Sequence, residues 1–354
     1  MKINFIVPEI VRSGGMRVIF EYANRLTKKG HQVTLFTPVI PFNPYKGLSN
    51  WAFQKYRIKY GMKYFTKKTL LPENIFSYNF KIKYVPSINN FFIPDADAVI
   101  ATSWTTSYYV NNLKISKGRK NYLIQDFEVW NCNEELARGS YRLPLKKIVV
   151  SAYLKELMLE LYQSDSCEIM PGIDYKLFFN SKKVFNKYPV ISFADHSLIN
   201  KNVEGGIEVA KKLKDRFPDL QINAFGVSRF HEFPDIIKFT ICNSDEEVRK
   251  MYCSSDIFLF PSLYEGFGLP PAEAMACQCA VVGNAVAAFP EYSVHNESAI
   301  HCDPSDISSL FDGVCGLLND IEKLKRISST ASESIREKLN WDDSVNKFEE
   351  VIFS

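Results

Sequence analysis

The chain alternates between short apolar runs and longer segments with helical spacing. Residues 2–8 form a β-rich run, residues 16–30 carry apolar side chains at helical spacing, and residues 31–37 return to a strand pattern. A strand, a helix and a strand in this order predict a βαβ unit with a parallel sheet and a right-handed crossover. Further strands are predicted at 98–101, 121–124 and 147–150.

The second half of the chain starts the same pattern again. Strand patterns and helical spacing alternate from residue 188 to residue 283, and an amphipathic helix is predicted at 341–353. A chain of 354 residues exceeds what one hydrophobic core usually accommodates. The sequence therefore predicts two α/β domains, at 1–180 and 181–338, each with a doubly wound parallel sheet. Ligands of such sheets bind beyond the carboxyl ends of the strands.

Composition supports this division and excludes several classes of protein. The net charge is +3, but residues 1–180 hold 25 Lys/Arg against 14 Asp/Glu, so the first half is basic and the second acidic. Since no run of eighteen apolar residues occurs, we expect no membrane span, and the N-terminus resembles a strand more than a signal peptide. The eight scattered cysteines indicate reduced thiols in a cytoplasmic protein.

Residues 265–273, EGFGLPPAE, carry the clearest chemical signal. They follow the apolar run DIFLFPS, so they are predicted to lie at the ligand-binding edge of the second sheet. The two prolines suit the start of a helix. Glu273 is then expected in the first helical turn, where its carboxylate can accept hydrogen bonds from a ribose diol. The alternative is a glutamate that only caps the helix.

The turn itself is predicted to present backbone amides to a ligand. Glycines allow a positive φ and close approach of the backbone, and free amides at a helix start bind phosphates or sugar hydroxyls. The candidate donor-binding positions of the turn are Gly266, Phe267, Gly268 and Leu269.

At this point the sequence resembles a known family. FPSLYEGFGLPPAEAMA resembles the signature of the retaining glycosyltransferases of family 4, which have the GT-B fold. PGIDYKLF (171–178), ISFADHSLINKNVEGGIEVAKKL (191–213) and the helix after Trp341 resemble further parts of it. The resemblance implies two Rossmann-like domains that face each other across a cleft. Residues 1–180 would serve the acceptor, residues 181–338 the nucleotide sugar, and residues 339–354 would cross back to the first domain.

The resemblance also implies an activity. A sugar would move, with retention of its anomeric configuration, from a UDP-, dTDP- or GDP-linked donor to a hydroxyl of a glycan or lipid-linked acceptor. The setting would be the synthesis of bacterial-type surface polysaccharide or glycoconjugate, without a metal or another cofactor. The alternatives are a GT-B sugar-nucleotide epimerase, a phosphorylase, or a catalytically weakened subunit that binds glycan.

Catalytic and donor-binding roles follow from the same resemblance. Glu265 would contact the sugar and Glu273 the ribose. Lys201 and His196 would stabilise the charge on the departing diphosphate. His196 stands where the family has arginine, so its charge would fall as the pH rises past its pKa. Gly14 and Gly15, after the first strand, would face the donor phosphates.

Acceptor contacts are predicted in YLIQDFEVW (122–130). Gln125 stands where many relatives have histidine, and the QDFE form resembles a subgroup that includes rhamnosyltransferases. Asp126 and Glu128 are candidates for hydrogen bonds to the acceptor hydroxyl, although polar residues at strand ends are often only loop residues. Asp95-Ala96-Asp97 has the spacing of a metal-binding motif, but we interpret it as the polar start of a strand.

Residues 40–85 form an unusually basic and aromatic segment, with nine Lys/Arg and one acid. One interpretation is a solvated basic surface. The other is a patch for anionic membrane lipid or a lipid-linked acceptor, which would place the protein peripherally at the inner face of the membrane. Nucleic acid is not expected, because no other motif supports it.

Overall fold

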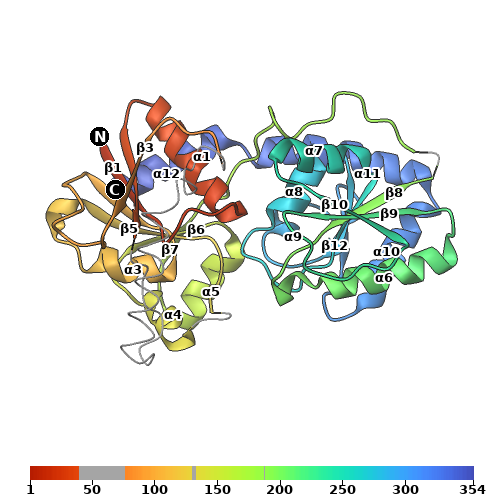
Figure 1. The fold of residues 1–354 in the computed structure, drawn as a ribbon, viewed down its shortest axis with the longest axis horizontal. Coiled ribbons are helices and arrows are strands. Elements are labelled where there is room, and N and C mark those ends of the chain that lie inside the picture. Colours follow the sequence, from red (N-terminus) through yellow and green to blue (C-terminus); the bar gives the residue numbers. More distant parts are fainter. Residues whose placement is uncertain (40–75, 130–132, 187) are drawn as a thin grey trace. The chain divides into compact units, whose positions relative to one another are not determined.

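The computed structural model describes residues 1–39, 76–129, 133–186 and 188–354 (Figure 1). The chain divides into two compact units: Met1–Met170 with Asp342–Ser354, and Pro171–Trp341. The division falls ten residues before the predicted boundary at 180, so the segment 171–180 belongs to the second unit. The predicted basic patch lies largely outside the described residues, because residues 40–75 are not among them.

The first unit contains a seven-stranded sheet in the order β3-β2-β1-β4-β5-β6-β7. Every neighbouring pair is parallel. The strands are β1 Lys2–Ile6, β2 Gln32–Pro38, β3 Lys81–Val85, β4 Ala98–Ala101, β5 Arg119–Ile124, β6 Lys146–Val149 and β7 Ser166–Glu168. The order reverses between β1 and β4, so the connections from these two strands run to opposite faces of the sheet, and ligands of such sheets bind at this point of the carboxyl edge.

Helices cover both faces of this sheet. They are α1 Gly14–Lys28, α3 Trp104–Asn111, α4 Glu134–Ser140, α5 Ala152–Tyr162 and α12 Trp341–Phe353, with a short 3-10 turn, η3 Ile115–Lys117. The C-terminal helix α12 is fixed by aromatic packing. Phe348 stacks on Tyr22 of α1 with ring centroids 4.2 Å apart, and the Tyr22 hydroxyl is 2.7 Å from Ser344 Oγ.

The second unit contains a six-stranded parallel sheet in the order β10-β9-β8-β11-β12-β13. Its strands are β8 Val190–Ala194, β9 Gln221–Gly226, β10 Ile237–Ile241, β11 Ile257–Phe260, β12 Ala280–Asn284 and β13 Ile300–Cys302. Here the order reverses between β8 and β11, which places the crevice at the ends of these two strands.

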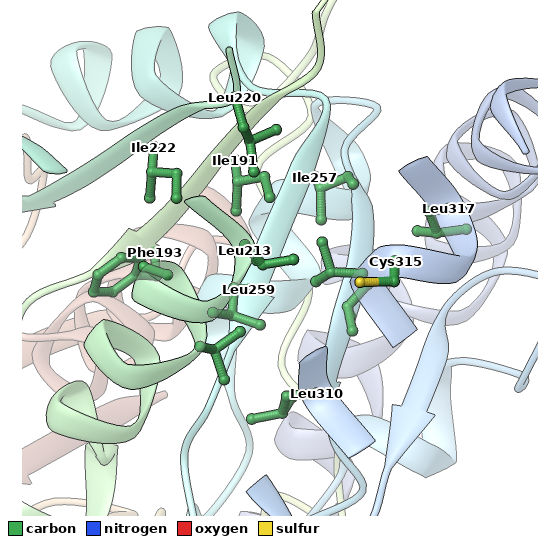
Figure 2. Close-up of a cluster of buried hydrophobic side chains, with 14 of the residues drawn as sticks. Ile191, Phe193, Leu213, Leu220, Ile222, Ile257, Leu259, Leu310, Cys315 and Leu317 are labelled. Carbon is green, nitrogen blue, oxygen red and sulfur yellow. The ribbon is translucent and has the colours of Figure 1, made fainter. Parts of the chain in front are cut away.

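The helices of the second unit pack on both faces of its sheet. They are α6 Val203–Arg216, α7 Asp245–Ser254, α8 Leu269–Ala276, α9 Phe289–Tyr292, α10 Ile307–Leu318 and α11 Ile321–Lys338, with the 3-10 turn η4 Ile199–Lys201. Alternate strand residues such as Ile191, Phe193 and Leu259 pack against Leu213 of α6 and Leu310 of α10 (Figure 2). On the opposite face, α8 packs against α7 and α11.

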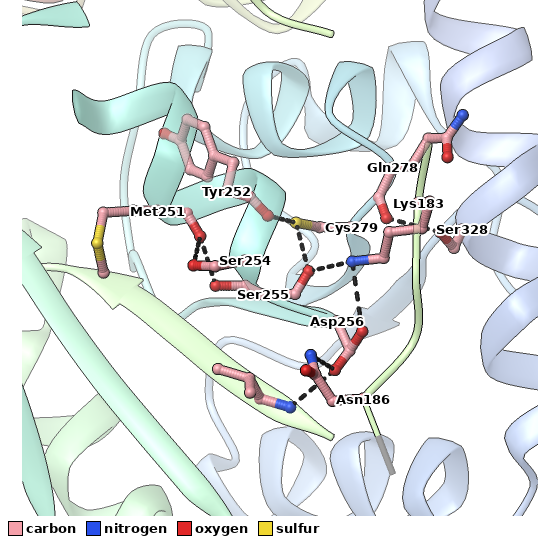
Figure 3. A network of polar contacts seen from close by, with 11 residues as sticks. Lys183, Asn186, Met251, Tyr252, Ser254, Ser255, Asp256, Gln278, Cys279 and Ser328 are labelled. Carbon is pink, nitrogen blue, oxygen red and sulfur yellow. Dashed lines mark hydrogen bonds and ion pairs between the residues drawn. The ribbon is translucent and has the colours of Figure 1, made fainter. Parts of the chain in front are cut away.

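A buried ion pair ties the segment before β8 to the second unit (Figure 3). Lys183 Nζ lies 3.3 Å from Asp256 Oδ1, and the two side chains are only 4% and 1% exposed. The other carboxylate oxygen of Asp256 accepts hydrogen bonds from Asn186 Nδ2 at 2.7 Å and from the Val190 amide at 2.9 Å. This network fixes the start of β8 relative to β11, and so the spacing of the two strands that flank the crevice.

We predict that Asp256→Asn lowers the free energy of unfolding of the second unit by about 3–5 kcal/mol, because it leaves the Lys183 ammonium buried without a counter-charge. Urea denaturation measures this. The matched control is Glu322→Gln, which breaks the exposed Lys325–Glu322 pair and is expected to cost less than about 1 kcal/mol. Equal losses for the two variants would contradict the role given to the buried pair.

Candidate functional site

Hydrogen bonds join the loops that leave β8 and β11. The Leu263 amide donates to the Asn200 carbonyl at 2.8 Å, and Asn200 Nδ2 returns a bond to the Tyr264 carbonyl at 3.0 Å. Asn202 Nδ2 donates to the Pro261 carbonyl at 3.2 Å. Side-chain amides suit this task because each supplies two donors and an acceptor. The two loops therefore form one rigid edge, although 64 residues separate them.

A third strand reinforces this edge. Asn284, at the end of β12, is buried and donates from Nδ2 to the carbonyls of Pro261 and Ser262, at 2.9 and 3.2 Å. The backbone that leaves β11 is thus held from the β8 side and from the β12 side before it enters the turn at residue 265. Sequence reasoning missed Asn284, because nothing in its local pattern distinguishes it from an ordinary strand-end asparagine.

Lys201 and Glu265 meet at the centre of this edge. Lys201 Nζ lies 2.6 and 2.7 Å from the two carboxylate oxygens of Glu265, and Ser262 Oγ donates to the same carboxylate at 2.9 Å. Their side chains are 22% and 9% exposed, so the ion pair is largely shielded from water. The sequence placed both residues at the site but did not predict that they bond to each other.

The turn between the two glutamates begins α8 in the predicted way. Gly268 is the residue before the helix and has φ 85° and ψ 65°, a left-handed conformation that glycine adopts without strain. The Tyr292 hydroxyl donates to the Gly268 carbonyl at 2.8 Å, and the Tyr292 ring packs on Phe267 with centroids 5.4 Å apart. These contacts fix the backbone of the turn, and the buried Phe267 side chain points away from solvent.

Glu273 does not lie in the first helical turn, and that prediction is wrong. The helix begins at Leu269, so Glu273 is its fifth residue, and the first turn contains no acidic residue. Glu273 is buried, and its Oε2 accepts a hydrogen bond from the Tyr252 hydroxyl of α7 at 3.3 Å. The Tyr252 hydroxyl and the packing between α7 and α8 therefore hold this carboxylate. The sequence had suggested that the free amides at the start of the helix would hold it.

His196 follows β8 and has a defined tautomer. Its Nδ1 accepts the Leu198 amide at 3.0 Å, so in the neutral ring the proton is on Nε2. Burial, together with the nearby Lys201 ammonium, lowers the pKa of His196 below its ordinary value. The free protein thus presents a neutral N–H donor at neutral pH, and the predicted charge of His196 beside a diphosphate stays a prediction.

Asp195 and His231 support this region and were missed by sequence reasoning. Asp195 Oδ1 lies 2.6 Å from His231 Nδ1, and its Oδ2 accepts the Phe230 amide at 2.8 Å. The Asp195 side chain is fully buried. These bonds hold the loop after β9 beside His196, whose ring centroid lies 6.4 Å from that of Phe230. The position of Asp195 directly after β8 was the one signal in the sequence that could have pointed to it.

In the first unit, the predicted glycines and Gln125 come together. Ser13 caps α1 by accepting the Met16 amide at 3.2 Å, so Gly14 and Gly15 form the first residues of the helix. A side-chain Cβ at Gly15 would stand 3.5 Å from Gln125 Nε2. The loops that leave β1 and β5 therefore approach each other at the carboxyl edge of the first sheet.

Glu128 forms hydrogen bonds near the start of α3. Its Oε2 accepts the Trp104 amide at 2.8 Å, and its own amide donates to the Tyr141 hydroxyl at 2.8 Å. Burial raises the pKa of Glu128 to about 8, despite the opposing bond from Trp104. Asp126, also predicted for the acceptor, accepts the Phe127 amide at 2.8 Å. Glu128 thus positions the loop after β5.

The pair of aspartates at 95 and 97 lies at the amino edge of the first sheet. Asp95 Oδ1 is 2.8 Å from Lys117 Nζ and accepts a bond from Ser116 Oγ at 2.9 Å, which lowers the pKa of Asp95. Asp97 accepts the Lys2 amide at 2.6 Å. Within the described residues, no three histidines, cysteines or acids gather as a metal site would require.

Comparison with known proteins agrees with this geometry. Residues 174–334 match the sequence family described as "Glycosyl transferases group 1". The MMP alpha-(1->4)-mannosyltransferase of Mycolicibacterium hassiacum is 28% identical over 221 residues, which is 58% of this chain and 52% of that protein. The O-antigen chain mannosyltransferase B of Escherichia coli is 30% identical over 99 residues, 28% of this chain and 25% of that protein. The chain thus matches about half or less of the length of these relatives.

Solved structures match over the whole chain. A mutant of S. aureus TarM, in complex with fondaparinux, alpha-GlcNAc-glycerol and UDP, superimposes with a TM-score of 0.74 at 14% identity, and the match covers 100% of both chains. The fold is therefore GT-B, with two Rossmann-like units, as predicted from the sequence. In the part of the chain that the structure describes, none of the helices has the length and apolar character that crossing a membrane requires.

We predict a specific pH dependence for the stability of the first unit. Because folding raises the pKa of Glu128 to about 8, its contribution is fully present below the pKa of the unfolded chain, about 4.3, and is lost as the pH rises through 8. Glu128→Gln keeps an acceptor for Trp104 and stays neutral. Denaturation at pH 5 should give similar stabilities for both proteins, and at pH 9 the variant should be more stable. Parallel profiles would contradict the burial of this carboxyl.

Proposed function

We propose that this chain is a retaining glycosyltransferase that moves a sugar from a nucleotide sugar to a hydroxyl of a glycan or lipid-linked acceptor. The observation that carries the proposal is the Lys201–Glu265 pair at the crevice between β8 and β11, beside the backbone turn and the buried Glu273. The match of residues 174–334 to group 1 glycosyl transferases supports it.

In this proposal, Lys201 meets the diphosphate of the donor. Two of its three N–H groups are directed to Glu265, and the third has no acceptor among the residues that the structure describes. Negative charge builds on the diphosphate as the bond to the sugar breaks, and a fixed ammonium in a shielded site stabilises that charge without reorganising. Glu265 orients this ammonium and lies where it can also contact the sugar.

His196 contributes a hydrogen bond instead of a full charge. Its Nε2–H can donate to a phosphate oxygen, because Nδ1 already accepts the Leu198 amide. A bound diphosphate would favour the imidazolium and raise the pKa of His196 from its lowered value in the free protein. The backbone amides of the turn at residues 266–269 add further donors, so this proposal needs no metal ion or other cofactor.

Glu273 is assigned to the ribose of the donor. A carboxylate held by packing and by the Tyr252 hydroxyl cannot rotate freely, so it offers a preorganised acceptor for the two ribose hydroxyls. On the first unit, Gln125 and Asp126 are assigned to the acceptor. The leaving phosphate oxygen takes the acceptor proton, which is consistent with transfer on one face of the sugar and retention of configuration.

The donor sugar is proposed from the relatives. Both relatives named above are mannosyltransferases, which makes GDP-mannose the first donor to test. The TarM structure contains UDP, so UDP-sugars are also candidate donors. The QDFE sequence makes a dTDP-linked deoxysugar such as rhamnose a further candidate donor. We further propose that the protein acts in the cytoplasm, in surface polysaccharide or glycoconjugate synthesis, and contacts the membrane peripherally through residues 40–85.

Incubation with GDP-, UDP- and dTDP-sugars, with and without a membrane lipid extract from the source cells, tests this function. We expect release of free nucleoside diphosphate that depends on the acceptor, and a product with the donor's anomeric configuration by NMR. Lys201→Met should lower kcat by about 100-fold or more. Lys212→Met, which removes an exposed lysine of α6, should leave kcat unchanged.

Other outcomes identify the alternatives. An isomerised nucleotide sugar would indicate an epimerase, and phosphate-dependent cleavage of a glycan would indicate a phosphorylase. Nucleotide binding without any transfer would indicate a weakened binding subunit. Each of these results would contradict the proposed transfer.

A further inference from the structure

The two most exposed large apolar side chains among the described residues of the first unit lie on neighbouring turns. Phe91, between β3 and β4, is 87% exposed, and Ile115, the first residue of η3, is 92% exposed. The residues just before them are hydrogen-bonded to each other, because Asn90 Oδ1 accepts the Lys114 amide at 2.7 Å. Phe91 and Ile115 therefore belong to one surface, the Phe91–Ile115 patch.

Hydrogen bonds fix the turn that carries Phe91. Asn89 Oδ1 accepts the amides of Phe91 and Phe92, at 2.9 and 3.2 Å, and Asn89 Nδ2 donates to Ser87 Oγ at 2.8 Å. The Ile93 amide donates to the Asn89 carbonyl at 3.1 Å, and the Ile93 side chain is buried. The turn is thus anchored on both sides of Phe91, whose own side chain stays exposed.

The 3-10 turn η3 is fixed in a similar way. Lys117 is buried, and its Nζ lies 2.8 Å from Asp95 Oδ1. Gly118 has φ 100°, and a Cβ there would stand 2.6 Å from the Ala98 amide nitrogen, so the end of η3 lies directly against the start of β4. The exposure of Ile115 is therefore a property of a fixed turn.

The surroundings of the patch are basic. From Ala98 to Gln125 the chain has four basic residues and no Asp or Glu. All four lie in the ten residues before and at the start of β5: Lys114, Lys117, Arg119 and Lys120. Lys117 is paired with Asp95, whereas the side chains of Lys114 and Arg119 are exposed. Apolar side chains within a basic surface match the hydrocarbon and the phosphate layers of an anionic bilayer.

The small area of the patch also favours a bilayer over a protein partner. A buried aromatic side chain covers about 150–250 Å². A stable protein interface buries about 800 Å² on each partner, which is more than Phe91 and Ile115 can supply. A bilayer accepts single apolar side chains without a complementary shape.

The position of the patch keeps the candidate acceptor residues accessible. Gly118 directly precedes β5, so the patch lies at the amino edge of the first sheet. Gln125 and Asp126 follow the same strand at the carboxyl edge. Contact between the patch and a membrane therefore leaves the carboxyl edge open to substrate.

We propose that Phe91 and Ile115 enter the interface of an anionic lipid bilayer, with Lys114 and Arg119 at the lipid phosphates. This contact rests on the peripheral membrane location that the proposed function includes, and it uses a surface separate from residues 40–85. Burial of the two apolar side chains supplies binding that salt does not weaken. The basic side chains supply binding that salt screens.

Sedimentation with phosphatidylcholine vesicles, with and without phosphatidylglycerol, tests the patch. Wild-type protein should bind the vesicles with phosphatidylglycerol more tightly. The double variant Phe91→Ser/Ile115→Ser should bind them at least about tenfold more weakly than wild type, because it removes the apolar area that enters the bilayer. Leu159→Ser, which changes a 60% exposed leucine of α5, should bind as wild type does. All three side chains are exposed, so the variants should keep the wild-type midpoint in urea.

A tryptophan probe separates insertion from adsorption by charge alone. Bromine atoms on lipid acyl chains quench tryptophan fluorescence on contact. Phe91→Trp should be quenched by vesicles of brominated phosphatidylcholine and phosphatidylglycerol more strongly than wild type, which has four tryptophans. Leu159→Trp should add no quenching. Equal quenching of Phe91→Trp and wild type overturns the insertion of Phe91.

The outcomes distinguish this patch from the rest of the proposed function. Equal binding of wild type and the double variant to anionic vesicles overturns the patch and leaves a membrane contact elsewhere on the chain. Equal binding of wild type to both kinds of vesicle overturns the role of the basic side chains. Absence of binding to either overturns both membrane assignments, and the nucleotide-release assay still decides the transfer. A wild-type dimer that the double variant cannot form, without loss of vesicle binding, identifies a second copy as the occupant and overturns the lipid assignment.

Discussion

One shielded ion pair, between Lys201 and Glu265, holds the centre of the candidate site. Each partner alone would be costly at this position, because a charge removed from water needs a counter-charge and hydrogen bonds. The carboxylate receives two N–H groups from Lys201 and the hydroxyl of Ser262. Asn200, Asn202 and Asn284 supply the rigidity that keeps this geometry, since their amides join the loops of three strands.

In the proposed function, the same pair meets the diphosphate of the donor. An ammonium that is already oriented loses little entropy when a diphosphate arrives, and its shielding from solvent strengthens the interaction with developing charge. The second sheet makes this possible through its order. Because β8 and β11 are neighbouring parallel strands, the loops that carry Lys201 and Glu265 leave the sheet side by side, at the point of reversed strand order where ligands of such sheets bind.

Much of the architecture followed from the sequence. Alternation of apolar runs and helical spacing predicted both parallel sheets, and EGFGLPPAE predicted a turn followed by α8. Two of the missed strands have short or atypical patterns. Strand β3, KIKYV, alternates lysine with apolar residues and reads as part of a basic segment, and β13 has only three residues. Such edge strands take their identity from the neighbouring strand more than from their own composition.

The site was predicted less completely, because its chemistry arises from long-range contacts. Local pattern placed Glu273 in the first turn of α8. The helix starts at Leu269, however, and the Glu273 carboxylate accepts a hydrogen bond from Tyr252 of α7. Likewise, local pattern did not predict that Glu128 accepts the Trp104 amide at the start of α3, and its predicted contact with the acceptor stays a prediction. Pairing, burial and the resulting shifts in pKa depend on residues distant in sequence, which spacing alone cannot reveal.

The most direct test of the central claim is ³¹P NMR of GDP and UDP titrated with the protein. The account predicts that both phosphate resonances of at least one nucleotide shift on addition of wild-type protein. The change should be lost with Lys201→Met and retained with Lys212→Met. Equal perturbation by wild type and Lys201→Met would contradict the claim that the Lys201–Glu265 pair forms the diphosphate site.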